Sequence, residues 1–282
     1  MSRPRRWCAL GALCVMVSSA SFAEPQKAGL GAALSCPLEP GRRSFALEVE
    51  GRERGGRLEV GPKAGLDGAA PVLLLFHGWG GYANGFLDTV DVSRVWPEAV
   101  VIAPTGLPRR FPGLMPRSHP GWQIAKDEFG DRDLELFDAL LAAVEALPCL
   151  DATRVTSSGF SNGGFFVNLL GCERSAKLAA IAAVAGGGPT GECADALPAW
   201  VGHGDRDRVV KPREGRRSFE SWQRTNACEA TGSESDSCVA AAGCARETVM
   251  CRHPGRHNWP RPLTGPWVDF LRRQSRSAKA PS

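Results

Sequence analysis

A serine between glycines has the most specific chemical context in this chain. Residues 159–164 read Gly-Phe-Ser-Asn-Gly-Gly, so Ser161 has a glycine two positions before it and two positions after it. Residues 154–158 predict a buried strand, and residues 165–170 predict the start of a helix. Gly-x-Ser-x-Gly between a strand and a helix is the nucleophile-elbow pattern, in which a strained turn exposes the serine hydroxyl. Ser161 is therefore the candidate nucleophile.

A serine hydroxyl needs a base that takes its proton and an acid that holds the base. Asp205 and Asp207 follow the apolar run 197–203, at the end of an expected strand, where parallel sheets keep their sites. His253 and His257 are the only histidines after these acids. His257 lies between the last expected strand and the last expected helix, which favours it as the base and leaves His253 as the alternative. Spacing alone does not choose between the two aspartates.

Acyl transfer at a serine also needs two N–H donors for the oxyanion of the tetrahedral intermediate. The backbone N–H of Asn162, directly after the nucleophile, is the first candidate. The second is expected in the glycine-rich run 77–81, where Trp79 is preferred and Gly80 comes next.

The expected elements alternate between strands and helices. The predicted strands are 44–50, 57–60, 72–76, 100–104, 154–158, the end of 178–185, 197–203 and 247–250, and the predicted helices are 133–147, the segment after the elbow, 218–227 and 266–273. Residues 24–40 are expected to form an extended arm. This order implies an α/β fold with a mainly parallel central sheet and helices on both faces. One catalytic domain is expected over residues 24–275.

The first 23 residues have the features of a signal peptide. Arg3, Arg5 and Arg6 precede a short apolar run, and small residues end it at Ala23. The whole chain has 34 basic and 30 acidic residues, so without these arginines the charges almost balance. Composition therefore gives no support for a nucleic-acid partner, and no membrane attachment is expected after cleavage. The predicted location is outside the cytoplasm, extracellular or periplasmic, and the polar tail 276–282 is expected to be disordered.

Eight of the ten cysteines follow the signal segment, and an even number in an exported chain indicates disulfides. A metal site is disfavoured because no close C-x-x-C pair is present. Cys172 with Cys193 would pin the crossover after the elbow helix. The four cysteines between 228 and 251 are expected to pair among themselves, which leaves Cys36 with Cys149.

Four motifs in order resemble the secreted polyhydroxybutyrate depolymerase-like esterases, which include bacterial and fungal feruloyl esterases and acetylxylan esterases. They are His-Gly-Trp-Gly-Gly at 77–81, Gly-Phe-Ser-Asn-Gly-Gly at 159–164, His-Gly-x-x-Asp-x-x-Val at 203–210 and His-x-Trp-Pro at 257–260. The resemblance covers about residues 36–272. It implies an α/β-hydrolase fold stapled by disulfides, with neither metal nor cofactor in the reaction. It also implies Ser161 as nucleophile, His257 as base and Asp207, rather than Asp205, as acid.

Two positions depart from that family. Arg256 stands where the family often has glycine, and Trp79 stands where it often has cysteine. Both positions would line the acyl pocket, so the substrate does not transfer automatically. Trp79, Trp122 and Trp259 are expected to form an aromatic wall for an aryl acyl group or a sugar, with core packing as the alternative for each.

The resulting hypothesis is a secreted serine carboxylic-ester hydrolase that works through an acyl-enzyme. Feruloyl or related plant-polysaccharide esters are the first expected substrates, and a polyhydroxyalkanoate or acetylxylan is the alternative. A non-catalytic exported binding protein on the same scaffold is the competing class, and it would be expected to lack a triad residue. A peptidase is a third possibility, although no further domain that would select peptides is predicted. The sequence makes no prediction of oligomeric state.

Overall fold

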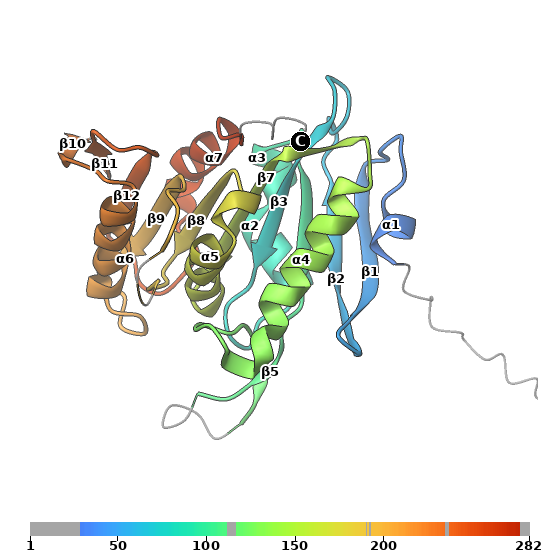
Figure 1. Cartoon of the computed structure of the whole chain (residues 1–282), viewed down its shortest axis with the longest axis horizontal. Coiled ribbons are helices and arrows are strands. Elements are labelled where there is room, and N and C mark those ends of the chain that lie inside the picture. The colour runs from blue at the N-terminus through green and yellow to red at the C-terminus, as the bar shows by residue number, and fades with distance from the viewer. Residues whose placement is uncertain (1–28, 112–116, 190, 192, 235–236, 277–282) are drawn as a thin grey trace, which may run out of the picture.

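The computed structural model describes residues 29–111, 117–189, 191, 193–234 and 237–276 (Figure 1). Its strands are β1 (Gly41–Val49), β2 (Arg52–Val60), β3 (Ala70–Phe76), β4 (Val100–Pro104), β5 (Leu107–Arg109), β6 (His119–Gly121), β7 (Leu150–Phe160), β8 (Ala180–Val184), β9 (Ala199–Gly204), β10 (Ala230–Glu234), β11 (Cys238–Ala242) and β12 (Thr248–His253). Its α-helices are α1 (Leu30–Ala33), α2 (Ala83–Val90), α3 (Val92–Val95), α4 (Arg132–Glu145), α5 (Asn162–Glu173), α6 (Pro212–Thr225) and α7 (Thr264–Arg272). Short 3-10 turns are η1 (Glu128–Asp131), η2 (Ser175–Lys177) and η3 (Arg261–Leu263).

Across the described residues, ten strands form one sheet in the order β1-β2-β4-β3-β7-β8-β9-β12-β11-β10. Neighbouring strands from β4 to β12 run parallel, and antiparallel pairs extend the sheet at both edges. Strands β5 and β6 pair separately as a small hairpin after β4. The expected mainly parallel α/β sheet is confirmed.

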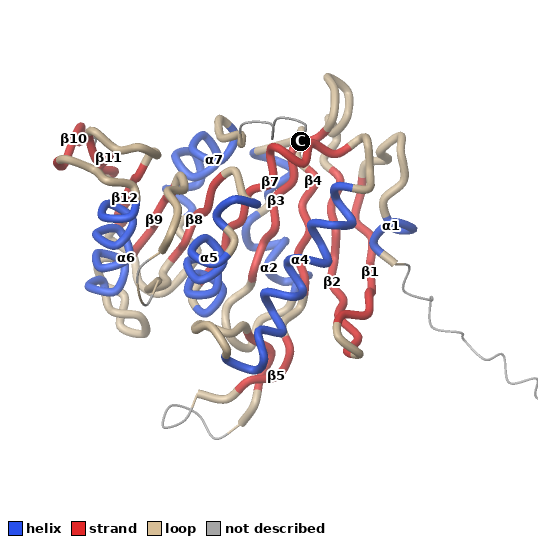
Figure 2. The backbone as a smooth tube through the Cα atoms, in the orientation of Figure 1, coloured by secondary structure: helices blue, strands red, loops and turns tan. Residues whose placement is uncertain are grey.

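Helices cover both faces of this sheet. In Figure 2, α4, α5 and α6 lie on the face toward the viewer, where Phe137, Phe166 and Trp222 join one core. Helices α2, α3 and α7 lie on the other face, whose core contains Phe86 and Trp267. All residues of β3 and β4 are buried, as their continuous apolar runs predict for strands covered on both sides.

Four disulfides join cysteines of the described residues, and they have the expected pairing. Cys36 joins Cys149, and Cys172 joins Cys193 across the connection that follows α5. The last four cysteines pair as Cys228 with Cys244 and Cys238 with Cys251. Both of these bonds lie around the β10–β11 hairpin, which widens the sheet at its far edge.

The structure differs from the expected elements at several places. The expected extended arm contains the short helix α1, which buries Leu30 and Ala33. Helices α2 and α3 and the two hairpins β5–β6 and β10–β11 were not predicted. Arg276, the first residue of the expected tail, donates hydrogen bonds to the carbonyls of Ala152 and Ala176.

The predicted signal peptide and residues 277–282 of the predicted tail lie outside the described residues. Within the part that is described, none of the helices has the length and apolar character that a membrane crossing requires.

Candidate active site

Ser161 lies in a strained turn between β7 and α5. Its φ is 54° and its ψ is −118°, and residues other than glycine rarely adopt a positive φ. A Cβ added to Gly159 would lie 2.3 Å from the Gly163 carbonyl oxygen, and one added to Gly163 would lie 2.2 Å from the Phe76 carbonyl oxygen. Both positions therefore require glycine, because the backbone of α5 lies in direct contact with the backbones of β7 and β3.

A continuous chain of hydrogen bonds joins Ser161, His257 and Asp207. The Ser161 Oγ lies 2.9 Å from His257 Nε2, and His257 Nδ1 lies 2.6 Å from Asp207 Oδ2. Asp207 is fully buried, and its other oxygen accepts the N–H groups of Val209 and Val210 at 2.8 and 3.0 Å. Because a carboxylate only accepts, Nδ1 carries the proton and Nε2 is free to accept the serine hydroxyl.

The alternative acid and base lie elsewhere. Asp205 is exposed and pairs with Arg252 at 2.7 Å. His253 is buried, and its Nδ1 accepts the Gly255 N–H at 3.2 Å. Burial lowers the pKa of His253. This histidine therefore stabilises the turn that leads to His257.

The acid and base segments are tied to each other through their backbones. Strands β9 and β12 are parallel neighbours, and the turn after β9 donates two hydrogen bonds to the end of β12 and the turn that follows it. The Asp205 N–H donates to the His253 carbonyl at 2.8 Å, and the Arg206 N–H donates to the Gly255 carbonyl at 2.9 Å. The Phe160 ring, directly before the nucleophile, packs on the His257 ring at a centroid distance of 4.9 Å.

The turn after β3 lies against the nucleophile. A Cβ at Gly78 would be 3.3 Å from the Ser161 Cβ. The Gly80 N–H already donates to the Pro120 carbonyl at 2.8 Å, so Gly80 is not a free oxyanion donor. The Trp79 indole N–H donates to the Arg109 carbonyl at 3.2 Å. The backbone N–H of Trp79 is left as the better candidate of the two.

His77 fixes the shape of this turn. Its Nδ1 donates to the Gly78 carbonyl at 2.7 Å, and its Nε2 accepts the Gly106 N–H at 3.0 Å. Burial lowers the pKa of His77 to about 4, and the contact with the Gly78 carbonyl only partly offsets that effect. The imidazole is therefore neutral near pH 7 and can keep its acceptor nitrogen toward Gly106.

Trp122 connects this turn with the elbow. Its indole N–H donates to the His77 carbonyl at 2.8 Å. Its backbone N–H donates to the Asn162 Oδ1 at 2.7 Å, and its carbonyl accepts the Asn162 Nδ2 at 3.0 Å. The residue after the nucleophile is thus held by its side-chain amide, which orients its own backbone N–H.

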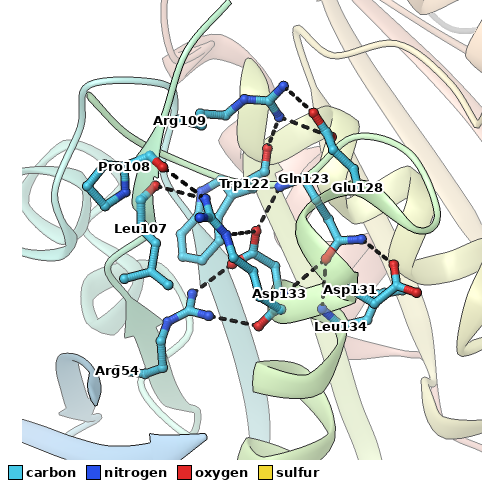
Figure 3. A network of polar contacts seen from close by, with 12 residues as sticks. Arg54, Leu107, Pro108, Arg109, Trp122, Gln123, Glu128, Asp131, Asp133 and Leu134 are labelled. Atoms are coloured by element: carbon cyan, nitrogen blue, oxygen red, sulfur yellow. Dashed lines mark hydrogen bonds and ion pairs between the residues drawn. The ribbon is translucent and has the colours of Figure 1, made fainter. Parts of the chain in front are cut away.

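A largely buried network of polar contacts connects Trp122 and Gln123 to β2, β5 and α4 (Figure 3). Arg109 donates to the Trp122 carbonyl and pairs with Glu128 at 2.8 Å. Gln123, which follows Trp122 in the sequence, donates its backbone N–H to the Asp133 side chain at 2.8 Å. Asp133 in turn pairs with Arg54 of β2 at 2.8 Å, and the two side chains are 0% and 1% exposed.

Two of the three tryptophans that were expected to form an aromatic wall for the substrate, Trp122 and Trp259, are instead buried. Trp122 is 0% exposed and packs between Phe76 and Phe166, and Trp259 is 6% exposed and packs against Trp267. Core packing, the alternative for each tryptophan, describes both. Of the three tryptophans named, only Trp79 is partly exposed, where its ring contacts two further rings on the β5–β6 hairpin, those of Phe111 and His119.

Sequence reasoning missed the Asn162 amide and the network behind it. Asn162 and Trp122 are 40 residues apart, and Arg54 and Asp133 are 79 apart, so no local pattern signals either contact. Among the described residues, no group of three or more His, Cys, Asp or Glu side chains is placed to hold a metal ion.

Comparison with known proteins identifies relatives among esterases. The chain is 29% identical over 184 residues to feruloyl esterase D of Neurospora crassa, covering 61% of this chain and 57% of that protein. It is 26% identical over 240 residues to a probable feruloyl esterase C of Aspergillus terreus, covering 79% and 82%. The chain thus spans little more than half the length of the Neurospora protein. No family model matches the chain.

Solved structures show the same fold. An acetyl xylan esterase from Aspergillus awamori superposes with a TM-score of 0.61 at 11% identity, over 80% of this chain and 99% of that one. A thermostable esterase superposes with a TM-score of 0.58 at 19% identity, over 83% and 63%. These likenesses establish the α/β-hydrolase fold. The sequence relatives are feruloyl esterases and these structural neighbours are esterases, so the chain is similar to carboxylic ester hydrolases in both sequence and fold.

Proposed function

We propose that this chain is an exported serine esterase that acts through an acyl-enzyme, with Ser161 as nucleophile, His257 as general base and Asp207 as the acid that orients it. The observation that carries the proposal is the unbroken hydrogen-bond chain from the Ser161 hydroxyl to the buried Asp207 carboxylate. All three side chains of a triad are present, which disfavours a binding protein on a disabled scaffold.

The proposed reaction follows from this geometry. As Ser161 Oγ attacks the ester carbonyl, His257 Nε2 takes its proton and Asp207 stabilises the imidazolium. The backbone N–H groups of Trp79 and Asn162 receive the developing oxyanion. His257 then gives its proton to the leaving alcohol. A water molecule attacks the acyl-enzyme by the same route and releases the acid, without a cofactor.

A hydroxycinnamoyl ester, specifically a feruloyl ester of a plant polysaccharide, is the proposed substrate. The names of the sequence relatives support it. The aromatic surface of Trp79, Phe111 and His119 beside the oxyanion turn also supports it, because a flat aryl acyl group packs well against ring edges and faces.

Export is proposed on two grounds. Residues 1–23 have a basic start, an apolar centre and small residues at the end. The four disulfides fit an oxidising compartment, outside the cell or in a periplasm.

Hydrolysis of methyl ferulate and of p-nitrophenyl esters from acetate to octanoate tests the proposal. We expect turnover that Ser161→Ala abolishes. Ser157→Ala is the matched control, because Ser157 is a buried serine four residues earlier whose hydroxyl has no hydrogen-bond partner among the described residues. Preference for acetate or for the longer chains would replace the feruloyl assignment with an acetyl or polyester one. Inactivity on every ester would favour a non-catalytic binding protein over an esterase. Activity that survives in Ser161→Ala would exclude Ser161 as the nucleophile.

A further inference from the structure

A groove of about 370 Å³ opens next to the oxyanion turn and is not part of the triad site. It lies between the start of α2, the middle of β1, the first part of β2 and the segment that follows β4. The side chains and backbone that matter here come from Ser44, Gly55, Arg57, Tyr82, Asn84 and Thr105. Tyr82 directly follows the glycine-rich run 77–81.

The groove opens on the same edge of the sheet as the nucleophile. Strand β2 runs antiparallel to β4, so its Gly56 pairs with Pro104 at the carboxyl end of β4. The strand order β2-β4-β3-β7 places three strand spacings, about 14 Å, between β2 at the groove and β7, which ends directly before Ser161. Gly106, on the groove wall, donates its N–H to His77 of the oxyanion turn. A substrate held at Ser161 can therefore extend into the groove along one edge.

The lining suits a neutral ligand that has many hydroxyl groups. Tyr82 is 60% exposed and offers a flat ring face with a hydroxyl at its end. Arg57 donates a hydrogen bond to the Ser44 hydroxyl, and both are partly exposed. Glu53 of the same groove has the opposite charge to Arg57, which disfavours a polyanion. The third charged residue there, Arg54, is already neutralised by Asp133.

Gly55 lines the groove without contributing a side chain to it. Alternate residues of a strand point to opposite faces, so Gly55, Arg57 and Glu59 share one face of β2. That face is the α2 side, because Arg42 bridges Glu59 to Asp88 of α2. A Cβ added at Gly55 would lie 3.0 Å from the Phe45 carbonyl oxygen and 3.9 Å from the Ala46 Cα, with no other neighbour within 4 Å, so a longer side chain here would extend into the groove that Gly55 lines.

We propose that this groove is a saccharide subsite, which binds sugar units of the polysaccharide chain whose ester is cleaved at Ser161. The Tyr82 ring packs on the C–H face of a sugar, and Arg57, Asn84 and Thr105 bond its hydroxyl groups. This inference rests on the proposed polysaccharide-ester substrate, and it distinguishes that substrate from a small free ester.

The sharpest test uses the fact that Tyr82 is the only tyrosine of the chain. Protein with ¹³C-labelled tyrosine and the Ser161→Ala change gives one set of ring signals and cannot turn over an ester. Titration with an arabinoxylo-oligosaccharide that carries no ferulate should shift those signals saturably. The shift should disappear in Gly55→Leu, whose side chain would occupy the groove. An unchanged tyrosine signal at millimolar saccharide would overturn the subsite, whatever the esterase activity is.

Kinetics provide the second test, with Tyr82→Ala compared with Leu66→Ala. Leu66 is 72% exposed in the loop between β2 and β3, at the opposite ends of the strands from the groove. On a feruloylated arabinoxylo-oligosaccharide we expect Tyr82→Ala to lower kcat/KM about fivefold to tenfold through KM, while methyl ferulate turnover stays within about twofold. Leu66→Ala should change neither.

The two tests separate failure of the subsite from failure of the proposed function. Equal effects of Tyr82→Ala on both esters, or no effect on either, would overturn the subsite while leaving the esterase assignment in place. A chain inactive on both esters would contradict the esterase assignment, and the tyrosine titration would still decide whether the groove binds saccharide.

Discussion

The side-chain amide of Asn162 binds both backbone polar groups of Trp122. Its Oδ1 accepts the Trp122 N–H at 2.7 Å, and its Nδ2 donates to the Trp122 carbonyl at 3.0 Å. The same tryptophan donates its indole N–H to the carbonyl of His77. One buried residue therefore links the two segments that supply the proposed oxyanion donors, Asn162 itself and the turn that contains Trp79. We infer that Trp122 positions these donors relative to each other, although it does not touch the substrate.

Trp122→Phe should lower kcat about tenfold and leave KM within about twofold. The change keeps a buried ring and removes the indole N–H, so the His77 carbonyl loses a partner and the Trp79 turn can move away from Asn162. Misplaced oxyanion donors weaken transition-state binding selectively, and loss of a whole donor typically costs 10²–10³-fold. Hydrolysis kinetics on methyl ferulate, with the affinity for a boronic acid inhibitor of the serine, measure the effect.

Trp222→Phe is the matched control for that prediction. Trp222 is equally buried and also donates its indole N–H, to Asn168 in the middle of α5 at 2.8 Å. It should lose a similar amount of unfolding free energy with kcat nearly unchanged. Equal kcat losses in both variants would reduce the role of Trp122 to general stability.

Asp207→Asn should lower kcat by about 10³–10⁴-fold, whereas Asp205→Asn should stay within about twofold of the parent. An amide at position 207 can no longer fix Nδ1–H of His257, so the imidazole loses its acceptor tautomer toward Ser161. Asp205 only pairs with Arg252 at the surface. The same ester assays read both variants, and the reverse order of effects would assign the acid to Asp205.

Removal of one partner of the Arg54–Asp133 pair should destabilise the fold strongly. Both side chains are almost completely buried, so Asp133→Leu leaves the Arg54 charge uncompensated in the core, and Arg54→Met leaves Asp133 with the longer 3.7 Å ion pair to Arg132. We expect a loss of about 3–5 kcal/mol of unfolding free energy in urea for each single variant, and a smaller loss for the double variant Arg54→Met with Asp133→Leu. A double variant that loses the sum of the two single effects would show that the ions do not act as a pair.

Stability should fall on acidification from about pH 6.5 toward pH 4. The pKa of His77 is about 4 in the folded chain and 6.5 for an ordinary histidine. Between these values the unfolded chain binds a proton that the folded chain excludes, so the unfolding free energy falls by about 1.4 kcal/mol per pH unit, to a total of about 3 kcal/mol. Above pH 6.5 this contribution is constant.

Burial also lowers the pKa values of His203 and His253, which steepens the decline in the same direction. Urea unfolding of the parent and of His77→Asn at several pH values between 4.5 and 7 measures the slope. The variant should show the shallower slope. Equal slopes would mean that His77 is not the group that excludes the proton.

The sequence predicted what depends on local patterns. The buried runs that became β3 and β4 are apolar on both faces, and the glycines around Ser161 mark a turn that no other residue permits. The missed helix α2 begins with Ala83, Asn84 and Gly85, residues that locally resemble a loop, and its burial of Phe86 becomes visible only once the sheet is placed.

In the candidate site too, local motifs were predictable from the sequence, and features that depend on tertiary contacts were not. Ser161 and His257 stand out by motif and order, and the buried Asp207 differs from the exposed Asp205 only in the folded chain. Trp122 illustrates the opposite outcome. An isolated tryptophan suggests a binding surface, and its burial between two phenylalanines follows from contacts that join distant segments.

The cysteine pairing has a consequence for the route by which the chain oxidises. Joining the cysteines strictly in sequence order, as oxidation during N-to-C emergence would, already gives Cys36–Cys149 and Cys172–Cys193. The last four interleave, since Cys228 must pass over Cys238 to reach Cys244. Sequential oxidation would trap that hairpin in mismatched bonds, which only thiol exchange can correct. Yield of correctly bonded protein should therefore depend on a disulfide isomerase through this one hairpin, far from the nucleophile.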